Sequence, residues 1–204
     1  MSHTFETDEQ RVSYGIGRQM GDQLLSSNIP DLTVELVMAG LRDAYTQQPR
    51  QVEEAAMQAA FETLQGKMKA LAEETARAAG KAGIEFLERN AAREGIITLP
   101  SGLQYEVISA GTGATPTASS TVRTHYEGTL ISGEVFDSSY KRGQPAEFPV
   151  GGVIAGWTEA LQLMQEGAKW RLYIPSNLAY GERAAGSIPP HSTLIFDIEL
   201  IEVL

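Results

Sequence analysis

Residues 156–164 have the sequence GWTEALQLM, and this stretch decides the fold expected for the second half of the chain. Its apolar residues recur at i, i+3, i+4 and i+7, which predicts one short amphipathic helix. The runs on either side alternate between apolar and polar residues instead, as half-buried strands do. These runs lie at 103–107, 122–130, 170–174 and 194–200. One helix among several antiparallel strands predicts an α+β domain over residues 95–204, a curved antiparallel sheet that wraps a single short helix.

The first half of the chain has a helical pattern. Only Pro30 and Pro49 interrupt residues 1–94, and both stand where helices are expected to end. We predict helices over 8–26, 31–44 and 51–94, with Asp31 or Thr33 as the N-cap of the second. The third would span about 65 Å if continuous. Gly80 and Gly83 are the place where it is expected to bend, because glycine inside a helix costs about 1 kcal/mol relative to alanine.

The long helix carries an apolar seam with heptad spacing, which needs a partner. Two partners are possible: the two shorter helices of the same chain, or a second copy of the chain. We favour a second copy, because two short helices form a small core for so long a helix and an exposed seam promotes aggregation. The first half is therefore predicted to be an all-helical dimerisation domain, with residues 1–50 as its main part and 51–94 as a connecting helix. The candidate dimerisation residues are Tyr14, Gly17, Met20, Gly21, Met57, Phe61 and Leu64.

Glycines 15, 17 and 21 do not form a phosphate-binding loop, since the spacing differs from that motif and no strand precedes them. The step from Gly17 to Gly21 more plausibly lets another helix approach closely.

Composition excludes several classes of function. The net charge of −10 is shared by both halves, so neither offers the basic surface that nucleic acid requires. The chain has no cysteine, which excludes disulfides, a thiol nucleophile and a Cys-ligated metal. The polar, acidic N-terminus does not resemble a secretory signal, and no stretch approaches 18 apolar residues. We expect a cytoplasmic protein with no nucleic-acid partner and no contact with membranes.

No conventional catalytic motif occurs in the sequence: there is no HExxH, no Walker loop and no nucleophile elbow. His125, beside Tyr126 on a predicted strand, is interpreted as a hydrogen-bonded strand histidine and not as a ligand or base. We expect neither a metal nor a cofactor. What stands out is a set of aromatic and aliphatic residues at strand ends and in loops, with Asp137 directly after Phe136. Spacing alone fits an apolar binding pocket and plain core packing equally well.

Five separated segments resemble the FKBP prolyl isomerases in order and spacing. They are VRTHYEGTL (122–130), GEVFDSS (133–139), GGVIAGWTEALQLM (151–164), IPSNLAYGERAAGSIPP (174–190) and STLIFDIEL (192–200). The segment SYGIGRQMG (13–21) and the long helix also resemble the N-terminal arm of the macrophage-infectivity-potentiator branch of that family. The similarity is greatest to its short, cytoplasmic, two-domain bacterial members, which are V-shaped homodimers.

The resemblance implies a role for each pocket residue. Trp157 would form the floor under the proline ring, and Ile188 would cover the edge. The backbone N–H of Ile154 and the hydroxyl of Tyr180 would hold substrate carbonyls. Asp137 would lie near the rotating amide, kept ionised by Arg142. The walls would be formed by Tyr126, Phe136, Phe148, Val153 and Phe196, with Tyr126 also in the catalytic group.

The implied activity is peptidyl-prolyl cis-trans isomerisation. Its partners would be proline-containing peptides, unfolded or partly folded proteins, macrolide inhibitors and a second copy of the chain. Two departures from the family affect peptide preference and macrolide affinity: Ala146 replaces a common aromatic, and the loop from Tyr180 to Ile188 is one residue shorter. The alternatives are a non-catalytic module that binds unfolded proteins and a dimeric scaffold.

Overall fold

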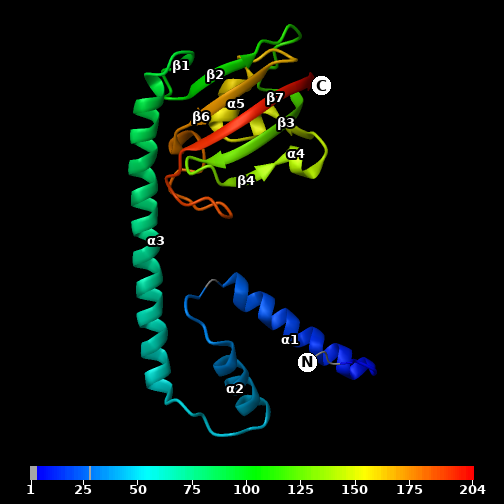
Figure 1. Ribbon diagram of the computed structural model, residues 1–204, viewed down its shortest axis with the longest axis vertical. Helices are drawn as coiled ribbons and strands as arrows, with labels where there is room; N and C mark the ends of the chain where they lie inside the picture. The colour runs from blue at the N-terminus through cyan, green and yellow to red at the C-terminus, as the bar shows by residue number, and fades with distance from the viewer. Residues whose placement is uncertain (1–3, 28) are drawn as a thin grey trace. The chain divides into compact units, whose positions relative to one another are not determined.

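The computed structural model describes residues 4–27 and 29–204, which divide into two compact units, Met1–Glu62 and Thr63–Leu204. The boundary between the units falls inside the longest helix, α3 (Glu54–Ala91). Figure 1 shows the helices of the first unit and the sheet of the second. The predicted domain boundaries at 50 and 94 stay predictions, and the compact second unit includes the greater part of α3.

The first unit contains α1 (Asp8–Ser26), α2 (Val34–Tyr45) and the beginning of α3. Thr7 caps α1 in a reciprocal capping box with Gln10, so α1 has the predicted bounds. The second helix begins at Val34 and not at residue 31, because Asp31 adopts a left-handed conformation with φ of 56°. Thr33 takes the N-cap position of α2, although its side chain makes no capping hydrogen bond.

Helix α3 continues unbroken through Gly80 and Gly83, the place where we expected a bend, and Figure 1 shows no kink there. Its 38 residues span about 57 Å at 1.5 Å per residue. Both glycines lie against other parts of the second unit, so their lack of a side chain serves packing rather than bending.

The second unit is a seven-stranded antiparallel sheet with strand order β1-β2-β6-β7-β3-β4, to which β5 adds by pairing with β3. The four predicted strands are present, and the three short strands β1, β4 and β5 were not predicted. The strands are β1 (Ile96–Thr98), β2 (Gln104–Ser109), β3 (Thr121–Leu130), β4 (Val135–Ser138), β5 (Ala146–Pro149), β6 (Lys169–Ile174) and β7 (Leu194–Val203).

The predicted short helix is α5 (Ala155–Leu161), which ends three positions before the predicted end. Leu161 and Met164 are fully buried, as are Leu172, Ile198 and Leu200 from the strands. The core therefore lies between α5 and one face of the sheet. Three further short helices, α4 (Ser139–Arg142), η1 (Val150–Gly152) and η2 (Ser176–Leu178), join the strands around it.

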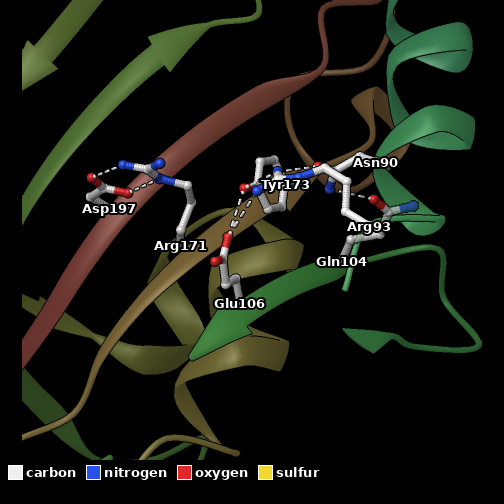
Figure 2. A network of polar contacts seen from close by, with 7 residues as sticks. All are labelled: Asn90, Arg93, Gln104, Glu106, Arg171, Tyr173 and Asp197. Carbon is white, nitrogen blue, oxygen red and sulfur yellow. Dashed lines mark hydrogen bonds and ion pairs between the residues drawn. The ribbon is translucent and has the colours of Figure 1, made fainter. Parts of the chain in front are cut away.

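A network of polar side chains fixes the end of α3 to the sheet, as Figure 2 shows. The amide of buried Asn90 donates to Gln104 Oε1 at 2.9 Å, and Gln104 Nε2 donates to the carbonyl oxygen of Leu87 at 2.9 Å. Arg93 Nη1 donates to the hydroxyl oxygen of Tyr173 at 3.0 Å. Because a buried amide is costly to leave unpaired, these bonds hold the helix at one place on the sheet.

The described residues include no helix that is long and apolar enough to cross a membrane.

Candidate functional site

A cavity of about 690 Å³ opens between α5, the sheet and the loops that follow η1 and η2. Its volume is typical of a site for a small molecule or a few residues of peptide. Every residue predicted for the pocket lines this cavity except Arg142, which reaches it through Asp137. Four small lining residues were not predicted: Gly152 at the end of η1, and Ala185, Gly186 and Ser187 in the loop that follows η2.

Trp157 forms the floor of the cavity and is only 4% exposed. The rings of Tyr126 and Phe196 meet it edge-on at centroid distances of 5.2 Å each, and Phe148 does so at 5.6 Å. Such T-shaped contacts fix the orientation of the indole. Its Nε1 is buried and has no hydrogen-bond partner within the described part of the chain. The floor is therefore an aromatic surface whose orientation is fixed by three neighbouring rings.

Gly128 makes room for one wall of the cavity. A Cβ atom at this position would lie 2.6 Å from ring atoms of both Phe136 and Phe196. These two rings meet edge-on with centroids 5.4 Å apart. The sequence analysis did not assign Gly128 to the site, although the alternation of Val122, Thr124 and Tyr126 along β3 continues to it and places it on the same face.

The polar edge of the cavity consists of Tyr126, Asp137 and Arg142. The Tyr126 hydroxyl donates to Asp137 Oδ2 at 2.5 Å, and Arg142 Nη1 donates to Asp137 Oδ1. Arg142 Nη2 also donates to the Tyr126 hydroxyl oxygen at 2.8 Å, with the guanidinium 5.5 Å from the centre of the tyrosine ring. The three side chains thus form a closed triangle in which each member contacts the other two.

This triangle keeps Asp137 ionised. Burial by itself raises the pKa of the Asp137 carboxyl, but the hydrogen bonds from Tyr126 and Arg142 outweigh burial and hold that pKa below its ordinary value. Burial, together with the hydrogen bond to Asp137, raises the pKa of the Tyr126 hydroxyl. At neutral pH the cavity edge therefore carries a carboxylate, a neutral phenol and a guanidinium.

Ser139 positions Tyr126 from behind the cavity, a role that the sequence analysis missed. The Tyr126 N–H donates to Ser139 Oγ at 2.8 Å, and that hydroxyl donates back to the Tyr126 carbonyl at 3.2 Å. His125 Nδ1 lies 2.9 Å from the same Oγ, and its ring stacks on Tyr140 with centroids 4.6 Å apart. The interpretation of His125 as a hydrogen-bonded strand histidine is confirmed.

The rim of the cavity offers hydrogen-bonding groups. Ile154 is the N-cap of α5, and its backbone N–H donates no bond within the described residues. Tyr180 is 40% exposed at the cavity mouth, whereas Ile188 is 5% exposed. A reciprocal pair of 3.0 Å backbone bonds between Ala185 and Ile188 closes the loop between them. Ala146, half-buried on β5, packs against the core without lining the cavity.

Nothing in this arrangement resembles a metal centre. Among the residues that the structure describes, no three His, Cys, Asp or Glu side chains lie close enough together to hold a metal ion.

Comparisons with known proteins agree with this geometry. A family model described as FKBP-type peptidyl-prolyl cis-trans isomerase matches residues 113–201, and one described as the domain amino-terminal to it matches residues 9–107. The chain is 48% identical to the FKBP-type 22 kDa peptidyl-prolyl cis-trans isomerase of Escherichia coli (strain K12), with 98% of each chain covered. It is 43% identical to the Outer membrane protein MIP of Legionella longbeachae, covering 97% of this chain and 86% of that protein.

Solved structures give the same result. The crystal structure of FkpA from Escherichia coli is similar with a TM-score of 0.72 and 36% identity, over 98% of both chains. A peptidyl-prolyl cis-trans isomerase from Pseudomonas syringae matches with a TM-score of 0.58 and 44% identity, over 62% of this chain and 94% of that one. A cavity with an aromatic floor, similarity along nearly the whole length and both family models lead to one conclusion: the chain belongs to the FKBP-type peptidyl-prolyl cis-trans isomerases.

Proposed function

We propose that this cavity performs the isomerisation by holding the proline ring on Trp157 while the amide before it rotates. The observation that carries the proposal is the set of three aromatic rings that hold the indole of Trp157 in T-shaped contacts and line the same cavity with it. The pyrrolidine ring of a proline is apolar and small enough to lie against the indole. No bond is made or broken in the reaction, so no nucleophile, metal or cofactor enters the proposed mechanism.

The apolar walls favour the twisted amide over the planar one. Rotation crosses a barrier of about 18–20 kcal/mol because it removes amide resonance, and uncatalysed it takes about 10–100 s. The planar amide has the larger charge separation and loses more solvation when it leaves water. Only interactions that differ between the two states accelerate the reaction, so this difference lowers the barrier.

The rim and the polar edge supply the remaining interactions. The Ile154 N–H and the Tyr180 hydroxyl would donate to the carbonyls on either side of the rotating bond. Asp137, held ionised by Tyr126 and Arg142, would lie next to the carbonyl carbon of the twisted amide. Each of these roles is part of the proposal.

The test is a proline-limited peptide isomerisation assay on the full chain. Tyr180→Phe should lower kcat/KM on the order of tenfold, the value of one hydrogen bond made in the transition state. Tyr140→Phe is the matched control, because Tyr140 is also 40% exposed but lies outside the cavity and donates to Glu199. Trp157→Ala should remove most activity, and an FKBP-class macrolide should inhibit the parent protein. Full activity in both Tyr180→Phe and Trp157→Ala contradicts the proposed roles.

We also propose that a second copy covers the apolar groove between α1 and α2. Neither helix buries a residue, and the groove between them has a volume of about 910 Å³. Tyr14, Gly17, Met20 and Gly21 line it, and a Cβ at either glycine would meet no atom within 4 Å. Phe61 on α3 is 57% exposed. A surface this apolar needs a partner, and helix-to-helix approach at the glycines fits a second copy.

The mass in solution tests dimer formation. Met20→Glu should be monomeric at micromolar concentration in sedimentation experiments. Val12→Glu, on the same helix but outside the groove, should stay dimeric. A monomeric parent protein would contradict the proposal.

A dimer would hold two cavities and could bind one unfolded chain at two points, which raises avidity through effective concentration. Met20→Glu should then isomerise short peptides normally and lose much of its effect on proline-limited refolding of a protein. Equal refolding by the monomeric variant would leave the arm without a role in client binding.

We propose that the protein is located in the cytoplasm, because a chain without cysteine suits a reducing compartment. Cell fractionation tests this proposal.

A further inference from the structure

Helix α3 touches the segment 189–193, which follows the loop at the cavity mouth. At this contact the helix presents two glycines to side-chain atoms of the segment. Gly83 is buried, and a Cβ there would overlap Thr193 Oγ1 and lie 3.1 Å from Thr193 Cβ. One turn earlier, a Cβ at Gly80 would lie 3.2 Å from Cβ of His191. Any side chain at these positions requires the segment or the helix to move.

Segment 189–193 is tied to the loop that carries Tyr180. The His191 N–H donates to the carbonyl of Gly181, the residue after Tyr180, at 2.7 Å. His191 adopts a left-handed conformation with φ of 60°, which is uncommon for a non-glycine residue and leaves its backbone little freedom to adjust. The Gly181 N–H in turn donates to the Ser176 carbonyl at 2.8 Å. A displacement of His191 would therefore be passed to Tyr180.

The same segment is tied to Ile188. The Ser192 hydroxyl donates to the carbonyl of Pro189 at 2.7 Å, which fixes the chain directly after Ile188. Thr193, 4% exposed, precedes the fully buried Leu194 at the start of β7. One end of the segment is thus anchored in the sheet and the other is attached to a cavity-lining residue.

The C-terminal end of the helix is fixed to the sheet by side-chain contacts. Its end is held by the buried pair of Asn90 and Gln104 and by Arg93 on Tyr173 (Figure 2). Phe86 packs against the Tyr173 ring with centroids 5.9 Å apart. Extra volume at Gly80 or Gly83 would therefore displace the segment more than the helix.

We propose that α3 is a positioning element of the active site. Gly80 and Gly83 set the place of segment 189–193, and through it the places of Tyr180 and Ile188 at the cavity mouth. The inference rests on the proposed function for the role of Tyr180. Neither glycine lines the cavity, so both act only through the loop.

The test compares two identical changes in one helix of the full-length protein. Gly83→Ala should lower kcat/KM by roughly tenfold or more, since a misplacement of about 1 Å can cost on the order of 100-fold. Gly66→Ala, where a Cβ meets nothing within 4 Å, should leave kcat/KM unchanged. Circular dichroism first establishes that both variants are folded, and the assay then uses the folded proteins. In Gly80→Ala the new Cβ makes a milder contact, 3.2 Å from His191 Cβ, so this variant should lower kcat/KM by about threefold. It replaces Gly83→Ala in the test if Gly83→Ala does not fold.

Two double variants separate positioning from a general loss of structure. Thr193→Ala removes the overlapping oxygen, so Gly83→Ala/Thr193→Ala should recover most of the lost activity. In a Tyr180→Phe background, Gly83→Ala should have a smaller effect than in the parent, because the part of its effect that acts through the Tyr180 hydroxyl is already lost.

Unchanged kcat/KM in both Gly83→Ala and Gly80→Ala, or a loss that Thr193→Ala does not relieve, would overturn the inference. So would a fully additive loss with Tyr180→Phe. Wild-type activity in the single variant Tyr180→Phe would instead contradict the role proposed for the Tyr180 hydroxyl, and recovery by Thr193→Ala would then still decide whether the helix sets the loop.

Discussion

Adding a single methyl group at Gly128 is expected to damage the cavity more than its size suggests. The new Cβ would lie 2.6 Å from Phe136 Cε2 and Cζ and from Phe196 Cε1, where carbon atoms normally stay about 3.5–4.0 Å apart. Both rings would have to retreat by about 1 Å. Phe196 is 5% exposed and meets Trp157 edge-on, so it cannot retreat without turning the floor of the cavity.

The cost has a stability part and an activity part. Overpacking a well-packed core costs about 1–3 kcal/mol, whereas replacing glycine by alanine in a strand gains roughly 0.5–1 kcal/mol. We therefore expect Gly128→Ala to lose about 1–2 kcal/mol of unfolding free energy. Displacement of two walls by about 1 Å should lower kcat/KM by 10-fold to 100-fold, on the order found for such misplacements.

Urea unfolding and the peptide assay measure the two parts on the same protein. Gly128→Ala/Phe136→Leu removes two of the three clashing ring atoms, so it should recover part of the stability while activity stays low, because a wall is missing. A Gly128→Ala protein with parental stability and parental kcat/KM would refute the reasoning. It would mean that the rings move apart without affecting the indole.

Two further predictions concern the cavity edge and the end of α3. The pKa of the Asp137 carboxyl is lower in the folded protein than in the unfolded chain, so the ionised carboxylate stabilises the fold. This stabilisation is present above the unfolded pKa of about 3.9 and is lost as the pH falls through the lower pKa of the folded protein. In Arg142→Met the pKa of Asp137 should be lowered less. The unfolding free energy of this variant, measured in urea between pH 5 and pH 2, should therefore fall less than that of the parent. An equal fall would contradict Arg142 as a cause of the lowered pKa. Asn90→Ala leaves buried Gln104 without one partner and should cost about 1–3 kcal/mol in urea unfolding, whereas Asn177→Ala, at an exposed position of η2, should cost little.

Periodicity identified the elements because each has a single dominant pattern. The 19 residues of α1 carry a helical pattern of apolar residues, and β3 alternates between half-buried and buried residues over its first eight positions, so both were predicted within a residue of their bounds. The short strands β1, β4 and β5 have three or four residues, which is at most two periods of alternation. The pairing partner, not the local sequence, makes these segments strands.

The large side chains that line the cavity could be named from the sequence, and the small lining residues could not. Trp157 and Phe136 are conspicuous in a sequence and occur inside the quoted family motifs. Gly128 leaves room for two aromatic rings, and Ser139 holds Tyr126 in place. Both roles depend on residues that are distant in the chain, so the local sequence does not reveal them. The same holds for Gly80 and Gly83: helix propensity predicted a bend, and a neighbouring segment makes them necessary instead.

The chain has two tryptophans, and the structure gives them different surroundings. Trp157 is the cavity floor, whereas Trp170 stacks on Tyr105 with ring centroids 4.2 Å apart and does not line the cavity. A ligand that enters the cavity would change the emission of one indole and leave the other as an internal reference. The protein thus contains its own fluorescent reporter of occupancy, and titrations of peptides can be followed without a label.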